Sequence, residues 1–131
     1  MDEKKMAEIE ARIRAEDEEK IRKEVEDEFN YMNRDFGWYK EHADAGDAQA
    51  QWNLGLCYDD GEGVSMDQEK AVYWYKKAAD QGYIPAYSSL GQCYEYGSGV
   101  SKNLDEAIYW YKKAADVGVD FAIEKLNKLR K

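Results

Sequence analysis

The sequence predicts an all-α fold in which pairs of antiparallel helices repeat along the chain. Three observations support this prediction: an internal repeat with a period of 36 residues, apolar side chains at helical spacing, and capping residues at the expected helix ends. The repeat carries most weight, because residues 54–82 and 90–118 align without a gap. Both segments contain the run YWYKKAAD, at residues 73–80 and 109–116.

The repeat also sets the expected domain boundaries. Counting back 36 residues from Trp74 reaches Trp38, and counting forward from Leu90 reaches Leu126, so the register extends beyond two whole units. We therefore predict a repeat domain over 36–131, preceded by a separate segment at 1–35. Within the domain we expect a half unit at 36–46, whole units at 47–82 and 83–118, and a C-terminal capping helix at 119–131.

Each whole unit has the pattern of two helices. Ala50, Leu54 and Tyr58 share one helical face early in the unit, and Ala71 and Tyr75 share another face later in it. Residues suited to N-capping precede the second helices, and glycines follow them. These residues are Asp67 and Asn103 as N-caps, Glu106 as the capping-box partner of Asn103, and Gly46, Gly82 and Gly118 at the helix ends.

Other glycines and the single proline fit the same pattern. Gly55 and Gly91 lie inside the first helices, where glycine costs roughly 1 kcal/mol relative to alanine, so we expect another helix to approach closely there. The Gly-x-Gly sequences at 61–63 and 97–99 lie between helices, where we expect positive φ. Pro85 falls in a first helical turn, where its missing N–H costs little.

The segment before the repeats is strongly charged and predicts a long helix. Residues 2–35 contain 13 acidic and 8 basic residues, with no glycine or proline. Several acid–base pairs stand four residues apart with the acid first, which is the favourable order in a helix. Glu8 with Arg12 and Glu16 with Lys20 are examples.

Two alternatives remain open for this helix. In one, it protrudes as a solvated helix, and only Val25 to Phe36 packs on the array as a cap. In the other, residues 6–30 form a coiled coil or dock on a partner. Asp17 interrupts the apolar line between Ile13 and Ile21, and heptads are not sustained, so the first alternative is favoured.

Composition argues against several classes of partner. The net charge of −9 disfavours nucleic acid and anionic membranes, because both require a basic face. No apolar run approaches the roughly 18 residues of a membrane span, and the first residues lack the apolar core of a secretory signal. We therefore expect a cytoplasmic protein.

The residues suited to chemistry are few and isolated. Cys57 and Cys93 occupy the same position in adjacent units, where helix axes about 8–10 Å apart disfavour a disulfide. We interpret them as buried core thiols. His42 has no metal-ligating residue at a suitable spacing, and the sequence at 59–63 lacks the alternating ligands of a calcium loop. We predict no enzyme activity, no metal site and no cofactor.

The repeat pattern closely resembles the Sel-one-like repeat, an α/α relative of the tetratricopeptide repeat. The resemblance rests on A-Q-W-N-L-G-x-x-Y-x-x-G-x-G-V and W-Y-x-K-A-A-D-x-G, and it covers about residues 36–131. It implies a right-handed solenoid of antiparallel helix pairs that acts as an adaptor in protein complexes. Some secreted relatives have two cysteines in each repeat, whereas this chain has one, which fits a reducing compartment.

The resemblance also implies where a partner would bind. In tetratricopeptide-type arrays the first helix of each pair lines the concave face. Trp52 is of special interest because its counterpart in the next unit is Ser88, so the aromatic ring is not a repeating packing element. The candidate partner-binding residues are Gln49, Trp52, Leu56 and Asp59 in the first unit, Ser88, Gln92 and Glu95 in the second, and Glu124 in the last helix.

These residues suit a protein or peptide partner with an apolar anchor and basic flanks. The leading hypothesis is therefore an interaction scaffold or adaptor. The alternative is a structural module in which the N-terminal helix drives weak self-association of an otherwise monomeric chain. A hydrolase is the third hypothesis, since a few relatives have been linked to such activity, but the sequence lacks a nucleophile–base arrangement.

Overall fold

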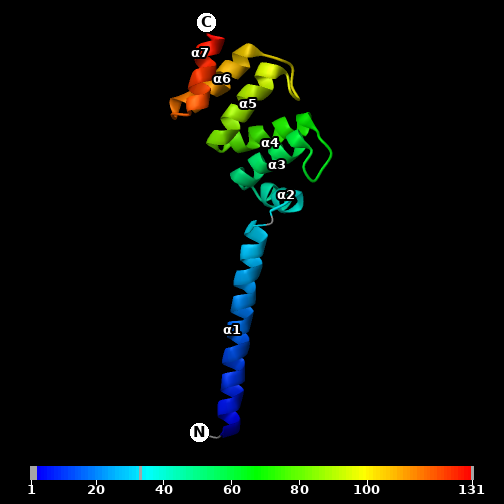
Figure 1. Ribbon diagram of the computed structural model, residues 1–131, viewed down its shortest axis with the longest axis vertical. Helices are drawn as coiled ribbons and strands as arrows, with labels where there is room; N and C mark the ends of the chain where they lie inside the picture. Colours follow the sequence, from blue (N-terminus) through cyan, green and yellow to red (C-terminus); the bar gives the residue numbers. More distant parts are fainter. Residues whose placement is uncertain (1–2, 33, 131) are drawn as a thin grey trace. The chain divides into compact units, whose positions relative to one another are not determined.

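The computed structural model describes the backbone of residues 3–32 and 34–130, and the side chains of residues 3–23 and 34–130. All regular secondary structure in these residues is helical, which confirms the predicted all-α class (Figure 1). The helices are α1 (Glu3–Met32), α2 (Phe36–Asp44), α3 (Ala48–Asp60), α4 (Gln68–Asp80), α5 (Ile84–Tyr96), α6 (Leu104–Asp116) and α7 (Asp120–Leu129).

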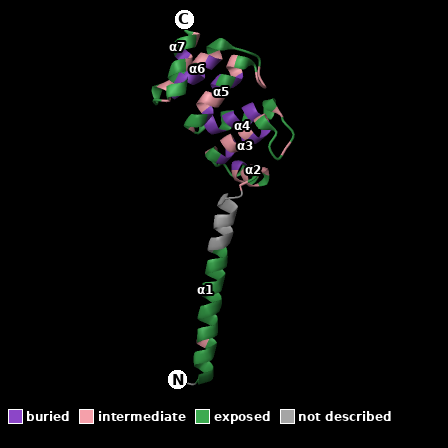
Figure 2. Ribbon diagram, viewed as in Figure 1, coloured by how far each residue is buried: buried purple, intermediate pink, exposed green. Residues whose placement is uncertain are grey.

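The chain divides into two compact units, Met1–Arg34 and Asp35–Lys131. The first unit contains α1, a helix of 30 residues. Its described side chains are almost all exposed, including the apolar Met6, Ile13 and Ile21 (Figure 2). Of the segment from Val25 to Phe36 that was predicted to pack on the array, residues 25–33 lie outside the described side chains. Phe36 does pack there, with its ring centroid 5.5 Å from that of Tyr58.

The second unit is an array in which each helix packs on the next one in the sequence. Extensive contacts join α2 to α3, α3 to α4, α4 to α5, α5 to α6, and α6 to α7. Its largest fully buried side chains are Leu54 and Tyr75 in one repeat, and Leu90 and Tyr111 at the same positions of the next. The residues that recur at 36-residue spacing therefore form the core.

Capping residues lie at the starts and ends of the helices where the sequence predicts them. The Asp67 and Asn103 side chains accept hydrogen bonds at 3.1 Å from the backbone N–H groups of Lys70 and Glu106, respectively. Only this half of the Asn103–Glu106 capping box is formed, because the backbone N–H of Asn103 donates to the carbonyl oxygen of Tyr94. The expected glycines follow α2, α4 and α6 with positive φ, namely Gly46, Gly82 and Gly118.

The glycines inside α3 and α5 allow the close approach that the sequence predicts. A Cβ atom added to Gly55 would lie 2.6 Å from ring carbons of Tyr75, and one added to Gly91 would lie 2.6 Å from the same atoms of Tyr111. Both tyrosine rings come from the partner helix of the same hairpin. Each helix pair is therefore packed around one glycine–tyrosine contact.

Replacing Gly91 by alanine should destabilise the array even though alanine is the better helix former. Overpacking a core costs about 1–3 kcal/mol, while the gain in helix propensity is about 1 kcal/mol. Because the Tyr111 ring is fully buried and has little room to move, we expect the upper part of this range, and urea unfolding should show a net loss of up to about 2 kcal/mol.

Gly37 provides the matched control in α2. There an added Cβ has its nearest neighbour at 3.4 Å, an ordinary contact with the Asp35 side chain. Gly37→Ala should leave stability unchanged or raise it by up to about 1 kcal/mol, because the gain in helix propensity is not opposed by overpacking. Equal effects of the two substitutions would contradict the importance of the glycine–tyrosine contact.

Candidate functional site

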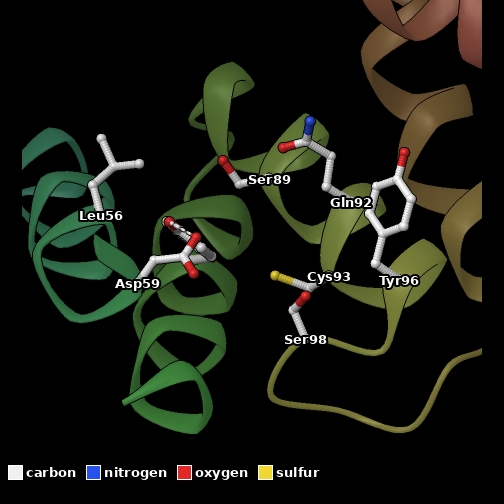
Figure 3. Close-up of a pocket in the computed structure, with 8 residues that line it drawn as sticks. Leu56, Asp59, Ser89, Gln92, Cys93, Tyr96 and Ser98 are labelled. Atoms are coloured by element: carbon white, nitrogen blue, oxygen red, sulfur yellow. Dashed lines mark hydrogen bonds between the residues drawn. The ribbon is translucent and has the colours of Figure 1, made fainter. Parts of the chain in front are cut away.

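The array contains a pocket of about 280 Å³ between α3, α4 and α5 (Figure 3). Its walls combine apolar, polar and acidic side chains from both sides of a repeat boundary. Leu56 and Asp59 come from α3, Tyr75 from α4, Ser89, Gln92, Cys93 and Tyr96 from α5, and Ser98 from the loop after α5.

Asp59 is the charged group of this pocket. Its Oδ2 atom accepts a hydrogen bond of 3.2 Å from the hydroxyl of Tyr75, which is fixed in the core beneath it. Burial, and then the nearby Asp59 carboxylate, raise the pKa of Tyr75 far above its usual 10.0. Tyr75 therefore remains a neutral donor, and it orients one carboxylate oxygen of Asp59.

Both cysteines are free and buried, as the sequence predicts. Burial, reinforced by the Asp59 carboxylate, raises the pKa of the Cys93 thiol to about 12. Burial also raises the pKa of Cys57. Because thiolate is the reactive form of cysteine, neither residue is activated as a nucleophile at neutral pH.

The remaining candidates for metal or acid–base chemistry are part of the helical packing. The ring of His42 stacks on Trp38 at 3.7 Å between centroids, and its Nδ1 lies 2.9 Å from the Trp38 carbonyl oxygen. Across the described residues, no cluster of three or more His, Cys, Asp or Glu side chains is arranged to hold a metal ion. None of the described helices has both the length and the apolar character of a membrane span.

Three of the predicted binding residues meet at the pocket: Leu56, Asp59 and Gln92. The other five do not line it. Gln49 and Glu124 are exposed elsewhere on the array, and Ser88 is half-buried beside the pocket residue Ser89. Trp52 and Glu95 each have a hydrogen-bond partner within the array.

Trp52 joins two consecutive repeats. Its indole N–H donates a hydrogen bond of 3.0 Å to the Ser89 hydroxyl, and its ring lies 5.8 Å from the ring of Tyr83. The side chain is half-buried. A non-repeating aromatic residue here therefore contributes to packing between α3 and α5, in addition to any role in binding.

The family of the chain follows from the repeated hairpin. The profile of the Sel1 repeat matches residues 48–83 and again residues 84–119, which together make up more than half of the sequence. The chain belongs to the Sel1 repeat family. Proteins of this family generally serve as scaffolds for protein interactions.

Solved Sel1 repeat structures are similar to this one. A protective antigen of uropathogenic Escherichia coli with an SLR fold is 36% identical with a TM-score of 0.73, and the alignment covers 77% of this chain and 24% of the antigen. A Sel1 repeat protein of Oxalobacter formigenes is 43% identical with a TM-score of 0.66, covering 70% and 37%. The chain thus spans well under half the length of either relative. No curated protein sequence matches it.

Cysteine rich protein B of Helicobacter pylori is a third similar structure. It is 27% identical with a TM-score of 0.65, and the alignment covers 70% of this chain and 68% of that protein. These similarities confirm the helical solenoid.

The second Sel1 repeat carries a counterpart of the Asp59–Tyr75 pair. Glu95 and Tyr111 stand 36 residues later, and the Tyr111 hydroxyl donates a hydrogen bond of 2.8 Å to Glu95 Oε1. Here a third residue joins them, because the ammonium group of Lys125 lies 3.1 Å from the same oxygen. Glu95 is therefore an ion-pair partner within the Sel1 array, and its side chain is largely shielded from water.

Proposed function

We propose that this chain binds a protein partner through the face of α3 and α5 that carries the pocket, and that it acts as a scaffold and not as an enzyme. The pocket is the observation that supports this proposal, because it is large enough to hold a side chain of a partner. Two of the residues that line it also differ between the first and the second repeat. Leu56 is replaced by Gln92 in the next unit, and Asp59 is replaced by Glu95.

The chemistry of the pocket favours a particular kind of partner. Leu56 and Tyr96 offer apolar surface, while Asp59 supplies negative charge at the same place. The whole chain has a net charge of −9, which attracts basic segments at long range. A segment with an apolar anchor and a basic flank complements this surface.

Two features support a scaffold in a reducing compartment such as the cytoplasm. Both cysteines are free and buried. Burial raises the pKa values of the two thiols, so neither cysteine forms the thiolate that an enzyme with a cysteine nucleophile requires at neutral pH. The location stays a prediction, and cell fractionation with an antibody against the chain would test it.

Selection of random displayed peptides on the immobilised full chain tests the binding face. The selected peptides are then titrated against the wild type and against Leu56→Ala combined with Gln92→Ala. We expect the double variant to bind them at least about tenfold more weakly, which corresponds to about 1.4 kcal/mol.

The matched control replaces two exposed residues on the second helices. Tyr73 in α4 and Tyr109 in α6 recur at the repeat spacing and are 53% and 51% exposed. Peptides that bind Tyr73→Ala with Tyr109→Ala as tightly as the wild type would support the α3–α5 face. Peptides that lose affinity only for this control variant would place the binding surface on the second helices and refute the proposal.

Self-association through α1 is a second candidate function, and exposed apolar residues on that helix favour it. Met6, Ile13 and Ile21 are 41%, 51% and 59% exposed. If they mediate association, Ile13→Lys with Ile21→Lys should convert a concentration-dependent oligomer into a monomer in sedimentation equilibrium. A wild-type chain that is monomeric at all concentrations would exclude this function.

A further inference from the structure

The two Sel1 repeats contain the same carboxylate–tyrosine pair but differ in what faces it. In the second repeat, Lys125 of α7 occupies the position in front of Glu95. In the first repeat, the residue 36 positions before Lys125 is Ser89. The comparison within one molecule therefore shows which group is missing at the Asp59 pocket.

The environment of Lys125 shows how the array holds an ammonium group. Its Nζ lies 3.1 Å from Glu95 and 2.8 Å from the hydroxyl of Tyr96. It also lies 5.2 Å from the centroid of the Tyr96 ring and 5.7 Å from that of Phe121. The side chains of Lys125 and Glu95 are only 17% and 13% exposed, so this ion pair is largely shielded from water.

The equivalent space in the first repeat is open, and Asp60 and Pro85 stand there in the places of Tyr96 and Phe121. Ser89 does not replace the lysine, because its hydroxyl accepts a hydrogen bond from Trp52 and donates one to the carbonyl oxygen of Pro85. Gln92 and Cys93 stand where the last helix has Lys128 and Leu129. The resulting cavity of about 280 Å³ far exceeds the ~15 Å³ that one water molecule requires.

Asp59 has no cationic partner within the described part of the chain. The ion pairs there join Lys40 to Asp44, Lys70 to Asp67, and Lys125 to Glu95. Tyr75 binds Oδ2 of Asp59, which leaves Oδ1 available to a ligand. Figure 3 shows the Asp59 carboxylate between the α3 and α5 sides of the pocket.

We propose that the Asp59 pocket binds a lysine side chain of the partner protein in the way that Glu95 binds Lys125. Asp59 is the counter-ion, Tyr75 positions it, and Leu56 and Tyr96 line the path of the apolar lysine stem. Lysine is the expected residue because the equivalent place in the second repeat holds a lysine, Lys125, whose compact ammonium group differs from the planar guanidinium of arginine. This inference names the partner chemistry for the proposed function and rests on it.

A titration of the full chain with N-acetyl-lysine methylamide, followed by backbone amide chemical shifts, tests the inference. We expect saturable shifts near Asp59, Gln92 and Ser98, weaker shifts with the arginine analogue, and none with the uncharged norleucine analogue. Asp59→Asn should weaken binding of the lysine analogue at least tenfold. The matched control Asp80→Asn removes an exposed carboxylate at the end of α4, which does not line the pocket, and should leave binding unchanged.

Ser89→Lys provides a test that needs no added ligand. If the pocket accepts an ammonium group, this variant should fill it, block binding of the lysine analogue, and unfold at a higher temperature than the uncharged Ser89→Met. Asp59→Asn in both backgrounds should remove that difference. Equal unfolding temperatures of Ser89→Lys and Ser89→Met, or equal effects of Asp59→Asn and Asp80→Asn on the titration, would overturn the inference.

Failure of this inference can be distinguished from failure of the proposed function. Displayed peptides that require Leu56 and Gln92 but bind Asp59→Asn normally would retain the binding face and refute the lysine pocket. Saturable binding of the lysine analogue, together with peptides that ignore the α3–α5 face, would retain the pocket and refute the face as the protein-binding surface.

Discussion

Replacing Gly99 by alanine should lower the free energy of unfolding by about 2–5 kcal/mol, from about 1–2 kcal/mol of backbone strain and about 1–3 kcal/mol of overpacking. Gly99 has a φ of +77°, a backbone conformation that residues with a Cβ atom rarely adopt. An added Cβ would also overlap the backbone carbonyl of Gln68 and lie 3.0 Å from the nitrogen of Glu69. Backbone atoms at the start of α4 cannot move aside as a flexible side chain can.

Gly118 separates the two causes of this loss. Its φ is +87°, but an added Cβ would meet nothing within 4 Å. Gly118→Ala should therefore cost only the strain of about 1–2 kcal/mol. Urea unfolding followed by circular dichroism measures both variants. An identical loss for the two would show that the contact between the 97–99 loop and α4 adds nothing to stability.

The second large effect concerns alkaline pH. Burial raises the pKa values of Tyr75 and Tyr111 well above their usual 10.0, and the Asp59 and Glu95 carboxylates reinforce the shift. Above pH 10 the unfolded chain therefore releases two protons that the folded chain retains. Stability is fully present below pH 10, and each tyrosine should remove about 1.4 kcal/mol of it by pH 11.

Urea unfolding between pH 9 and pH 11 measures this dependence. Lys125 contributes in the same direction, because its hydrogen bond to Tyr96 and its ion pair with Glu95 raise its pKa above 10.5. The variant Tyr75→Phe with Tyr111→Phe should be less stable at neutral pH but should lose less with rising pH. A wild type and a double variant with parallel pH profiles would contradict the assignment.

Much of the fold could be predicted from the repeat, because each helix is specified locally. The stripe of Leu54 and Tyr58, the cap at Asp67 and the glycine at 55 all act within one hairpin. Packing between hairpins is harder to predict from the sequence, since it depends on how closely α3 and α5 approach each other. The Trp52–Ser89 hydrogen bond could not be predicted from Trp52 alone, because the repeat alignment points to Ser88.

The pocket was only partly predictable for a related reason. Tyr75 and Cys93 belong to the apolar stripes, so the sequence assigns them to the core, and the structure places the same residues at the base of an open cavity. The signal that could have revealed it is a difference between repeats, namely Ser89 in the place of Lys125. That difference has meaning only once Lys125 is known to reach Glu95.

The neighbour-to-neighbour packing of α2 to α7 has a further consequence for how the chain acquires this structure. Extensive contacts join consecutive helices, so no distant ends of the array must find each other before the core begins to form. Such local topology is associated with rapid folding. Each hairpin can offer a template on which the next one orders, and growth can start at any unit and spread in both directions.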